Sequence, residues 1–408
     1  MRTVQPIHDE RFKRFCRPQG DPDAIRRLAW RRSVVRQHLL LSLRQERADE
    51  ELSYIVDHLA RIPESAKHRV LAAPETGLYI NSLLNGTTPD PQIVVPVIGR
   101  LAAASSPRSL QKFSWTGVLR LDYLPVGDRA IRIPGVTLDN PELVIDSQRI
   151  RLSSPTGGAI DVPIKPSEQM FKNCVVRANK LELVDGWIPF SDLFDDGNVS
   201  VNLDQSSRVV FLRLLEEAVK LINVVMPAAL EEMQDTAQYL SPIRPKELET
   251  NVLPSFSSPI LPGVIFVGIE TGDGRLIDAR HLAESCLHEH LHNRLYLLDE
   301  ALPLTIQHAN PRSYFSPWKQ TMRTIEGMLH AVYVFSHLVW FWSNAGARVI
   351  GLAKYAANNV KEQIEHLKFA TAEIDTDELT PVGRCILTAS RNILENLTRE
   401  STSRHVVR

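Results

Sequence analysis

Residues 278–299 read DARHLAESCLHEHLHNRLYLLD, and this stretch decides how the rest of the chain is organised. Asp278 is a favourable N-cap residue, and neither proline nor glycine interrupts the residues that follow it. Apolar residues recur at helical spacing through the stretch, which predicts one long helix with a packed face. These residues are Leu282, Leu287, Leu291, Leu295 and Leu298.

The predicted helix carries the motif H-E-x-x-H at His288, Glu289 and His292. Residues four apart on a helix lie on one face with their Cβ atoms about 5–6 Å apart, so two imidazoles can bind one metal ion. The alternative is a solvated row of histidines on a surface helix. A second polar helix further along the chain favours the metal site.

This second helix is predicted at residues 324–342, where the sequence is apolar on nearly every side. A helix of this kind is buried, and its buried polar groups need partners. Polar residues recur in it at spacings of three and four and form one stripe. They are Arg323, Glu326, His330, Tyr333 and His337. The simplest partner for the stripe is a metal ion on the first helix, and internal hydrogen bonds are the alternative.

The third metal ligand is either His330 or Glu326, which lie four residues apart on the second helix. A hydrolytic zinc site would use Glu326, with Glu289 as the general base. The longer zinc endopeptidase pattern H-E-x-x-H-x-x-G-x-x-H is absent, because Leu295 and Leu298 take the places of its glycine and its last histidine. His330 is favoured, because a neutral imidazole costs less to bury than a carboxylate.

Three protein ligands with open positions beside them would suit iron(II) that binds a co-substrate and oxygen. Arg323 lies two turns before His330 on the same face, and its guanidinium suits a bidentate contact with a carboxylate. A dicarboxylate co-substrate accounts for this arginine better than peptide-bond hydrolysis does.

The rest of the chain predicts an α+β fold dominated by helices. Residues 1–105 carry apolar residues at helical spacing and are expected to form an N-terminal helical region. Residues 106–205 alternate in short runs such as GVLRLDYL and ELVIDS, which predicts an irregular β-rich insertion. Residues 206–408 are expected to form a C-terminal helical metal domain. Within it, an apolar strand predicted at residues 264–269 would offer its edge to an extended peptide.

The amino-acid composition indicates which kinds of molecule the protein is expected to bind and where it is located. The 408 residues carry a formal net charge of −1, so no nucleic-acid partner is expected. The first residues contain no secretory apolar region, and the most apolar run, residues 331–342, is too short to span a bilayer. Four scattered cysteines without a C-x-x-C pair are typical of reduced thiols in a cytoplasm. We therefore expect a cytoplasmic protein with no membrane partner. The sequence does not indicate its oligomeric state.

Three segments resemble a known family. GVIFVG, HLAESCLHEHLHNRLYLLD and SPWKQTMRTIEGMLHAVYVF, within residues 262–342, are similar to the H-E-x-x-H domain of 2-oxoglutarate-dependent peptide β-hydroxylases, which modify ribosomally made peptides. The family shares an H-E-x-x-H-N-x-L helix, an S-P-W segment, a downstream arginine and the pattern G-x-L-H-x-x-Y-x-F. Their counterparts here are His288, Glu289, His292, Asn293 and Leu295; Ser316, Pro317 and Trp318; Arg323; and Gly327, Leu329, His330, Tyr333 and Phe335.

The resemblance implies that His288, His292 and His330 bind iron(II) and that Arg323 binds a carboxylate of the co-substrate 2-oxoglutarate. The product would be a peptide, derived from a precursor, that is hydroxylated at a side-chain β-carbon. Glu289 would lie beside the metal as a proton-handling group. Two alternatives are a zinc metallopeptidase with Glu289 as its base and a peptide-binding scaffold without catalysis.

Overall fold

The structure is a computed structural model of the chain. It describes residues 14–105, 107, 109–126, 129–165, 176–178, 181–185, 198–237, 239–245, 254–261, 263–270, 276–308 and 311–406. The chain forms two compact units, which we call the sheet unit and the histidine unit. The sheet unit comprises residues 29–215 and 237–278, and the histidine unit comprises residues 1–28, 216–236 and 279–408. The division into three domains along the sequence stays a prediction.

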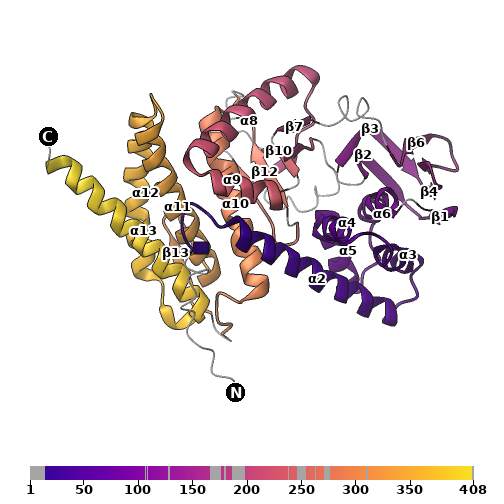
Figure 1. The fold of residues 1–408 in the computed structure, drawn as a ribbon, viewed down its shortest axis with the longest axis horizontal. Coiled ribbons are helices and arrows are strands. Elements are labelled where there is room, and N and C mark those ends of the chain that lie inside the picture. Colours follow the sequence, from indigo (N-terminus) through magenta and orange to yellow (C-terminus); the bar gives the residue numbers. More distant parts are fainter. Residues whose placement is uncertain are drawn as a thin grey trace. The chain divides into compact units, whose positions relative to one another are not determined.

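Helices make up the first part of the sheet unit, as the sequence predicts for the N-terminal region (Figure 1). They are α2 (Pro22–Glu46), α3 (Glu50–Leu59), α4 (Glu64–Ala72), α5 (Pro74–Leu84) and α6 (Pro91–Ser105). Proline starts three of these helices, where its fixed φ suits the first turn and its missing N–H is not needed.

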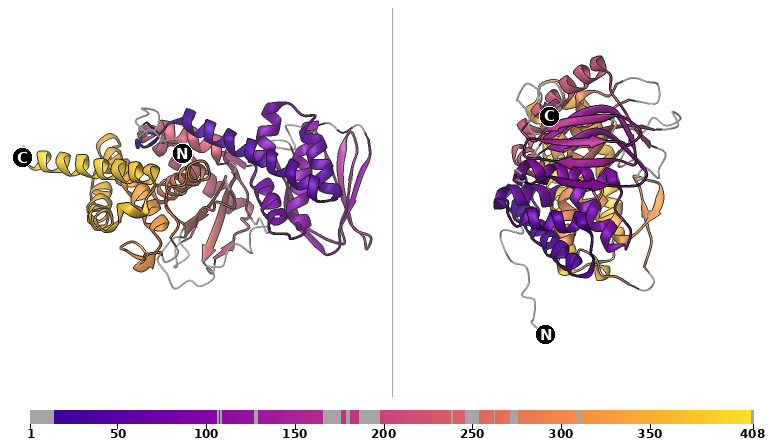
Figure 2. Two further views of the ribbon diagram at one scale, coloured as in Figure 1. Left: turned by 90° about the horizontal axis from the view of Figure 1, so that it is seen from below. Right: turned by 90° about the vertical axis from the view of Figure 1, so that its right-hand side faces the viewer.

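Antiparallel strands follow in the part of residues 106–205 that the structure describes (Figures 1 and 2). Their bounds are β1 (Gln111–Ser114), β2 (Val118–Val126), β3 (Arg129–Asp139), β4 (Glu142–Ile145), β5 (Arg149–Ser153) and β6 (Ala159–Pro163). Strands β2 and β3 pair as a ribbon, while the other four form a sheet in the order β1-β4-β5-β6. Ile150 and Leu152 are buried in β5 between exposed arginines, and they share one core with Ile98 and Leu101 of α6. One apolar face therefore fixes the strands on the helices.

A second sheet has the order β11-β12-β10-β8-β7, with β9 also paired to β10. Its strands are β7 (Val176–Ala178), β8 (Leu181–Leu183), β9 (Asn198–Ser200), β10 (Tyr239–Pro245), β11 (Ser255–Phe256) and β12 (Val264–Gly268). All five residues of β12 are buried, as in a central parallel strand. Strand β12 pairs with β10 on one side and with β11 on the other. The prediction that this strand offers a free edge to a peptide is therefore wrong.

Long helices dominate the histidine unit. They are α9 (Pro227–Thr236), α10 (Ala279–Ala301), α11 (Ile325–Arg348), α12 (Ala353–Glu373) and α13 (Pro381–Val406), with a short hairpin of β13 (Tyr314–Ser316) and β14 (Thr321–Arg323) and the 3-10 turn η2 (Thr376–Glu378). Pro227 separates α9 from α8 (Gln205–Val225), as expected from the missing N–H of proline. In Figure 1, α11 lies among α10, α12 and α13, and it packs against all three.

The two helices predicted to carry the site both form. Helix α10 begins directly after Asp278, and α11 begins after Thr324, whose hydroxyl accepts a hydrogen bond from Gly327 N at 3.2 Å. Helix α11 is buried on most of its surface, as its composition predicts. Within the described part of the chain, no helix has the length and apolar character needed to cross a membrane. Three cysteines are free there (Cys16, Cys286 and Cys385), while Cys174 lies outside the described residues.

Candidate metal centre

Helices α10 and α11 bring three histidines together, and we call His288, His292 and His330 the histidine cluster. His292 Nε2 lies 3.2 Å from His288 Nε2 within α10. His292 Nδ1 lies 3.2 Å from His330 Nδ1 of α11. The contact within α10 follows from the spacing of four residues, whereas the contact between the helices depends on how they pack.

His292 stands in the middle of the histidine cluster and presents a different ring nitrogen to each neighbour. A single ion takes one nitrogen from each imidazole, so binding through all three rings requires His292 or His330 to rotate. Accordingly, the described residues contain no group of three or more His, Cys, Asp or Glu side chains already arranged around one ion position.

Burial and neighbouring positive charges keep the imidazoles of the histidine cluster in the neutral form. Burial lowers the pKa of His288 to about 4, and the charge of Lys319 lowers it further. Burial followed by the charge of Arg323 lowers the pKa of His330 to about 4. Burial and the two neighbouring histidines lower the pKa of His292 well below its usual value. Neutral imidazole is the form that binds a metal ion.

Solvent access differs across the histidine cluster. The side chain of His288 keeps 24% of its surface exposed, whereas His330 is buried. His330 Nε2 is itself buried and has no hydrogen-bond partner among the described residues. A buried nitrogen without a partner is costly, so His330 has a polar atom to offer to a ligand.

Arg323 reaches the histidine cluster from the end of β14, directly before α11. It is exposed, and in the hairpin it pairs with Tyr314. A Cβ atom at Gly327 would lie 3.1 Å from Arg323 Nε, so the missing side chain of this glycine makes room for the guanidinium. The effect of Arg323 on the pKa values of His292 and His330, after that of burial, places its charge near both rings.

Aromatic rings form one wall of the histidine cluster. Trp318 stacks on Phe335 with ring centroids 4.5 Å apart, and the edge of Phe335 meets His288 at 5.3 Å. Trp318 Nε1 donates a hydrogen bond to Gln363 Oε1 at 2.6 Å, which fixes the indole between α11 and α12. The S-P-W segment therefore contributes a rigid apolar surface beside His288.

Glu289 is buried beside the histidine cluster. Its Oε1 lies 4.0 Å from His288 Nε2, which is beyond hydrogen-bond distance. Burial first, and the charge of Glu289 second, raise the pKa of the Cys286 thiol to about 12. The carboxylate therefore lies beside His288 and close enough for its charge to act on the Cys286 thiol.

The residues of the polar stripe predicted on the second helix differ in their surroundings. Glu326 is exposed, and its pKa is raised by partial burial and then by the charge of Asp299 near the end of α10. His337 Nδ1 donates a hydrogen bond to Tyr333 O at 2.8 Å, and burial lowers the pKa of His337 to about 3. Tyr333 and His337 lie against each other with ring centroids 4.1 Å apart, and the guanidinium of Arg294 lies 5.8 Å from the Tyr333 ring. That the whole stripe meets a metal ion stays a prediction.

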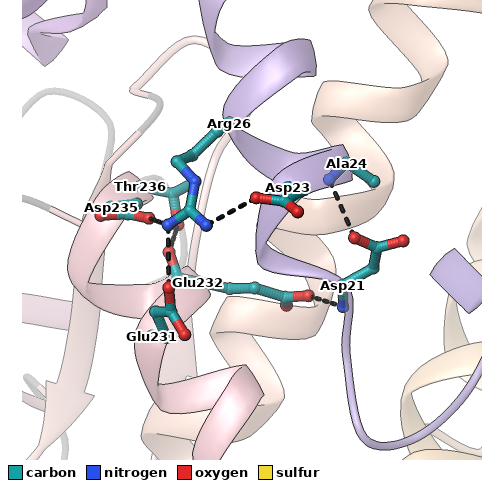
Figure 3. Close-up of polar contacts among 8 residues, drawn as sticks. All are labelled: Asp21, Asp23, Ala24, Arg26, Glu231, Glu232, Asp235 and Thr236. Carbon is teal, nitrogen blue, oxygen red and sulfur yellow. Dashed lines mark hydrogen bonds and ion pairs between the residues drawn. The ribbon is translucent and has the colours of Figure 1, made fainter.

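The opposite side of α10 holds a buried charge network that the sequence analysis missed. Glu232 of α9 lies 3.0 Å from His290 Nε2 and 3.2 Å from Arg294 Nε. Its other oxygen accepts a hydrogen bond from Asp21 N (Figure 3). Arg294 Nη2 donates to Phe15 O at 2.5 Å. Phe15, Asp21 and α9 are therefore joined to the helix that bears the H-E-x-x-H motif.

Charge pairing outweighs desolvation in this network. Burial by itself would raise the pKa of Glu232, but the charge of Arg294 and the hydrogen bond with His290 lower it. The side chains of Glu232 and Arg294 are both fully buried. The signal in the sequence was H-E-H-L-H-N-R itself, since His290 and Arg294 are polar residues on the face that α10 turns away from the histidine cluster.

Comparison of the chain with models of protein families and with curated proteins finds no match.

Removing the charge of Glu232 is predicted to destabilise the protein strongly. Glu232→Gln leaves Arg294 buried beside a neutral group, and loss of one partner of a buried pair costs about 3–5 kcal/mol. Urea denaturation measures the free energy of unfolding. The matched control is Glu231→Gln, whose carboxylate is 54% exposed and pairs with Arg26; it should cost about 1 kcal/mol or less. Equal losses in the two variants would contradict the assignment of the network.

Acid is predicted to destabilise the metal-free protein. The pKa values of His288 and His330 lie at about 4, against 6.5 for an ordinary histidine. Below pH 6.5 these histidines therefore bind protons in the unfolded chain but not in the folded protein. The free energy of unfolding consequently falls as the pH decreases towards 4. Thermal unfolding from about pH 7 to about pH 5 measures the loss. His330→Gln should show a smaller decrease in Tm over this range, and an unchanged decrease would contradict the account.

Proposed function

We propose that this chain is an iron(II)- and 2-oxoglutarate-dependent oxygenase that hydroxylates a side-chain β-carbon of a peptide, in a C-terminal metal domain built on α10 and α11. The observation that carries the proposal is the approach of His330 to the second histidine of the H-E-x-x-H motif, at 3.2 Å. This contact joins residues 38 positions apart and supplies the third imidazole that the motif lacks.

The donor types of the histidine cluster suit an iron ion, and a ring has to rotate before all three can bind it. Three neutral imidazoles match the ligand type that iron(II) accepts, and His330 Nε2 is a buried nitrogen without a partner among the described residues. His288, His292 and His330 would hold the ion. When bound, iron(II) supplies the site at which oxygen is activated, with 2-oxoglutarate as the reductant. The protein's part is to hold the three rings neutral and to exclude water at the wall formed by Trp318 and Phe335.

Arg323 is the residue that would bind a carboxylate of 2-oxoglutarate. It is exposed and has no acidic side chain within ion-pair distance in the described part of the chain. Two other arginines of this unit are already paired: Arg294 with Glu232, and Arg312 with Asp375 at 3.6 Å. A free, exposed guanidinium beside neutral imidazoles is suited to a bidentate contact with an incoming carboxylate.

Glu289 is assigned a supporting role. Its oxygen lies 4.0 Å from His288 Nε2, so it can hold or release a proton beside the histidine cluster. The substrate would be a ribosomally made precursor peptide. A cytoplasmic location belongs to the same proposal, because the three described cysteines are free thiols.

A zinc metallopeptidase is the second candidate, since Glu289 occupies the position of the general base in such enzymes. This candidate needs Glu326 as the third ligand. Glu326 is exposed, and the charge of Asp299 is one cause of its raised pKa, whereas His330 contacts His292. The geometry therefore favours three histidines.

Metal content of two variants separates the candidates. His330→Ala should lose stoichiometric iron after anaerobic reconstitution, because one of three ligands is removed. Glu326→Gln should keep both iron and most of the activity. The zinc-peptidase hypothesis predicts the reverse pattern, so metal loss in Glu326→Gln with retention in His330→Ala would overturn the oxygenase proposal.

Arg323→Leu is predicted to weaken the response to 2-oxoglutarate without loss of iron. A hydrogen bond to a charged group contributes about 1.5–3 kcal/mol, so the concentration needed for half-maximal succinate formation should rise by about 10- to 150-fold. Arg312→Leu is the matched control, because Arg312 is exposed and paired with Asp375. An unchanged dependence in Arg323→Leu would exclude this arginine as the carboxylate ligand.

A further inference from the structure

The ring of Tyr296 lies at the end of the histidine cluster that His292 and His330 form. Tyr296 belongs to α10 and follows His292 by four residues, as His292 follows His288. Residues at this spacing share one face of a helix. All three are partly exposed, whereas residues 289–291 and 293–295 between them are buried. Tyr296 therefore continues the row of α10 that carries the two histidines of the H-E-x-x-H motif.

The rings of Tyr296, His292 and His330 form a compact triangle. The centroid of the Tyr296 ring lies 5.2 Å from that of His330, with 39° between the ring planes. It lies 6.2 Å from the centroid of His292, with 21° between the planes. The two imidazole centroids are 5.4 Å apart. Ring pairs in contact have centroids about 4.5–7 Å apart, so Tyr296 packs against both imidazoles.

His288 has a different aromatic neighbour. The edge of Phe335 meets the His288 ring with centroids 5.3 Å apart, and Trp318 stacks on the other side of this contact at 4.5 Å from Phe335. His330 comes from α11, so its contact with Tyr296 crosses from one helix to the other. Tyr296 therefore gives His330 an aromatic contact from α10, as Phe335 of α11 gives one to His288.

His330 is the imidazole with the greater freedom to turn. Both ring nitrogens of His292 have a neighbour at 3.2 Å, which is His288 Nε2 on one side and His330 Nδ1 on the other. His330 has only the second of these contacts, and its Nε2 has no hydrogen-bond partner among the described residues. The contact with the Tyr296 ring is therefore a main restraint on the orientation of His330.

Restraint of a ligand ring affects how tightly a metal ion binds. A side chain that is free before binding loses rotamer entropy when it binds, which opposes the association. Residues that orient a metal ligand typically change metal affinity by about 10- to 100-fold when they are replaced. Since a ring of the histidine cluster has to rotate before all three imidazoles reach one ion, the orientations open to His330 determine the affinity.

We propose that Tyr296 is a positioning residue of the histidine cluster, whose aromatic ring keeps the imidazole of His330 beside that of His292. The inference rests on the proposed function, because it takes the histidine cluster as the metal centre, and it adds the residue that orients the third ligand. The contacts that carry it join rings and do not involve the tyrosine hydroxyl. Phenylalanine should therefore replace Tyr296 without loss, whereas leucine should not.

The affinity for iron(II) tests this inference, measured anaerobically by competition with a chromophoric chelator. Tyr296→Leu should weaken iron binding by about 10- to 100-fold, and Tyr296→Phe should bind iron as tightly as the unaltered protein. Tyr296→Met is a second variant without a ring and should behave like Tyr296→Leu. The matched control is Tyr355→Leu on α12, where the tyrosine ring meets Trp342 at 5.0 Å, and it should leave the affinity unchanged.

The number of imidazoles bound to each iron separates loss of orientation from a general loss of stability. X-ray absorption spectroscopy at saturating iron should find three imidazoles in Tyr296→Phe and two in Tyr296→Leu, because His330 is no longer held in place. A variant that is only less stable would keep all three. Circular dichroism of the metal-free variants verifies that each is folded.

Three outcomes would overturn the inference: an unchanged iron affinity in Tyr296→Leu, an affinity in Tyr296→Phe as low as in Tyr296→Leu, or three imidazoles per iron in Tyr296→Leu. Neither readout needs turnover. Iron binding that depends on the Tyr296 ring, without succinate formation, would reject the oxygenase and keep the positioning role. Succinate formation with an iron affinity that does not depend on the ring would reject the positioning role alone.

Discussion

The packing of α10 against α11 is the contact on which the histidine unit depends. The H-E-x-x-H motif places His288 and His292 on one face of α10, but the third imidazole comes from a helix that begins 24 residues after α10 ends. The distance of 3.2 Å between His292 Nδ1 and His330 Nδ1 exists only if the two helices keep their register. Burial of α11 on nearly every side supplies that register through apolar packing.

Both sides of α10 carry buried polar side chains. The free-energy cost of burying them is reduced in a different way on each side. On the side of the histidine cluster, the imidazoles give up their protons and stay neutral, which avoids the cost of a buried charge. On the other side, Arg294 stays charged because Glu232 and the carbonyl of Phe15 are within reach. The neutral side leaves imidazole nitrogens in the form that can bind a metal ion, while the charged side fixes the helix to α9 and to Phe15.

Local patterns in the sequence predicted the helices well. The starts of α10 and α11 follow from Asp278 and Thr324, while α11 runs to Arg348, six residues beyond the predicted end at Trp342. The proximity of His288 to His292 also follows from spacing alone. Contacts between residues far apart in the sequence did not follow from these patterns. Nothing near His290 or Arg294 in the sequence indicates Glu232, which is 58 residues from His290.

The same limit applies to the polar stripe and to the strand before α10. A stripe on one helix indicates which residues share a face, but it does not say what each of them meets, and the contact between Tyr333 and His337 could not be foreseen from it. An apolar strand indicates burial, but its neighbours in the sheet are set by distant segments, so the pairing of β12 with β11 was not foreseen. The hairpin of β13 and β14 was not predicted, and Arg323, which the sequence analysis assigned to the helical stripe, lies in β14.

The central claim is that His288, His292 and His330 bind the same iron ion. X-ray absorption spectroscopy of the anaerobically reconstituted protein measures it most directly, because multiple scattering from imidazole rings reports how many of them are bound to each iron. The account predicts three imidazoles per iron in the unaltered protein. A count of two, with a carboxylate oxygen as the third protein ligand, would contradict it.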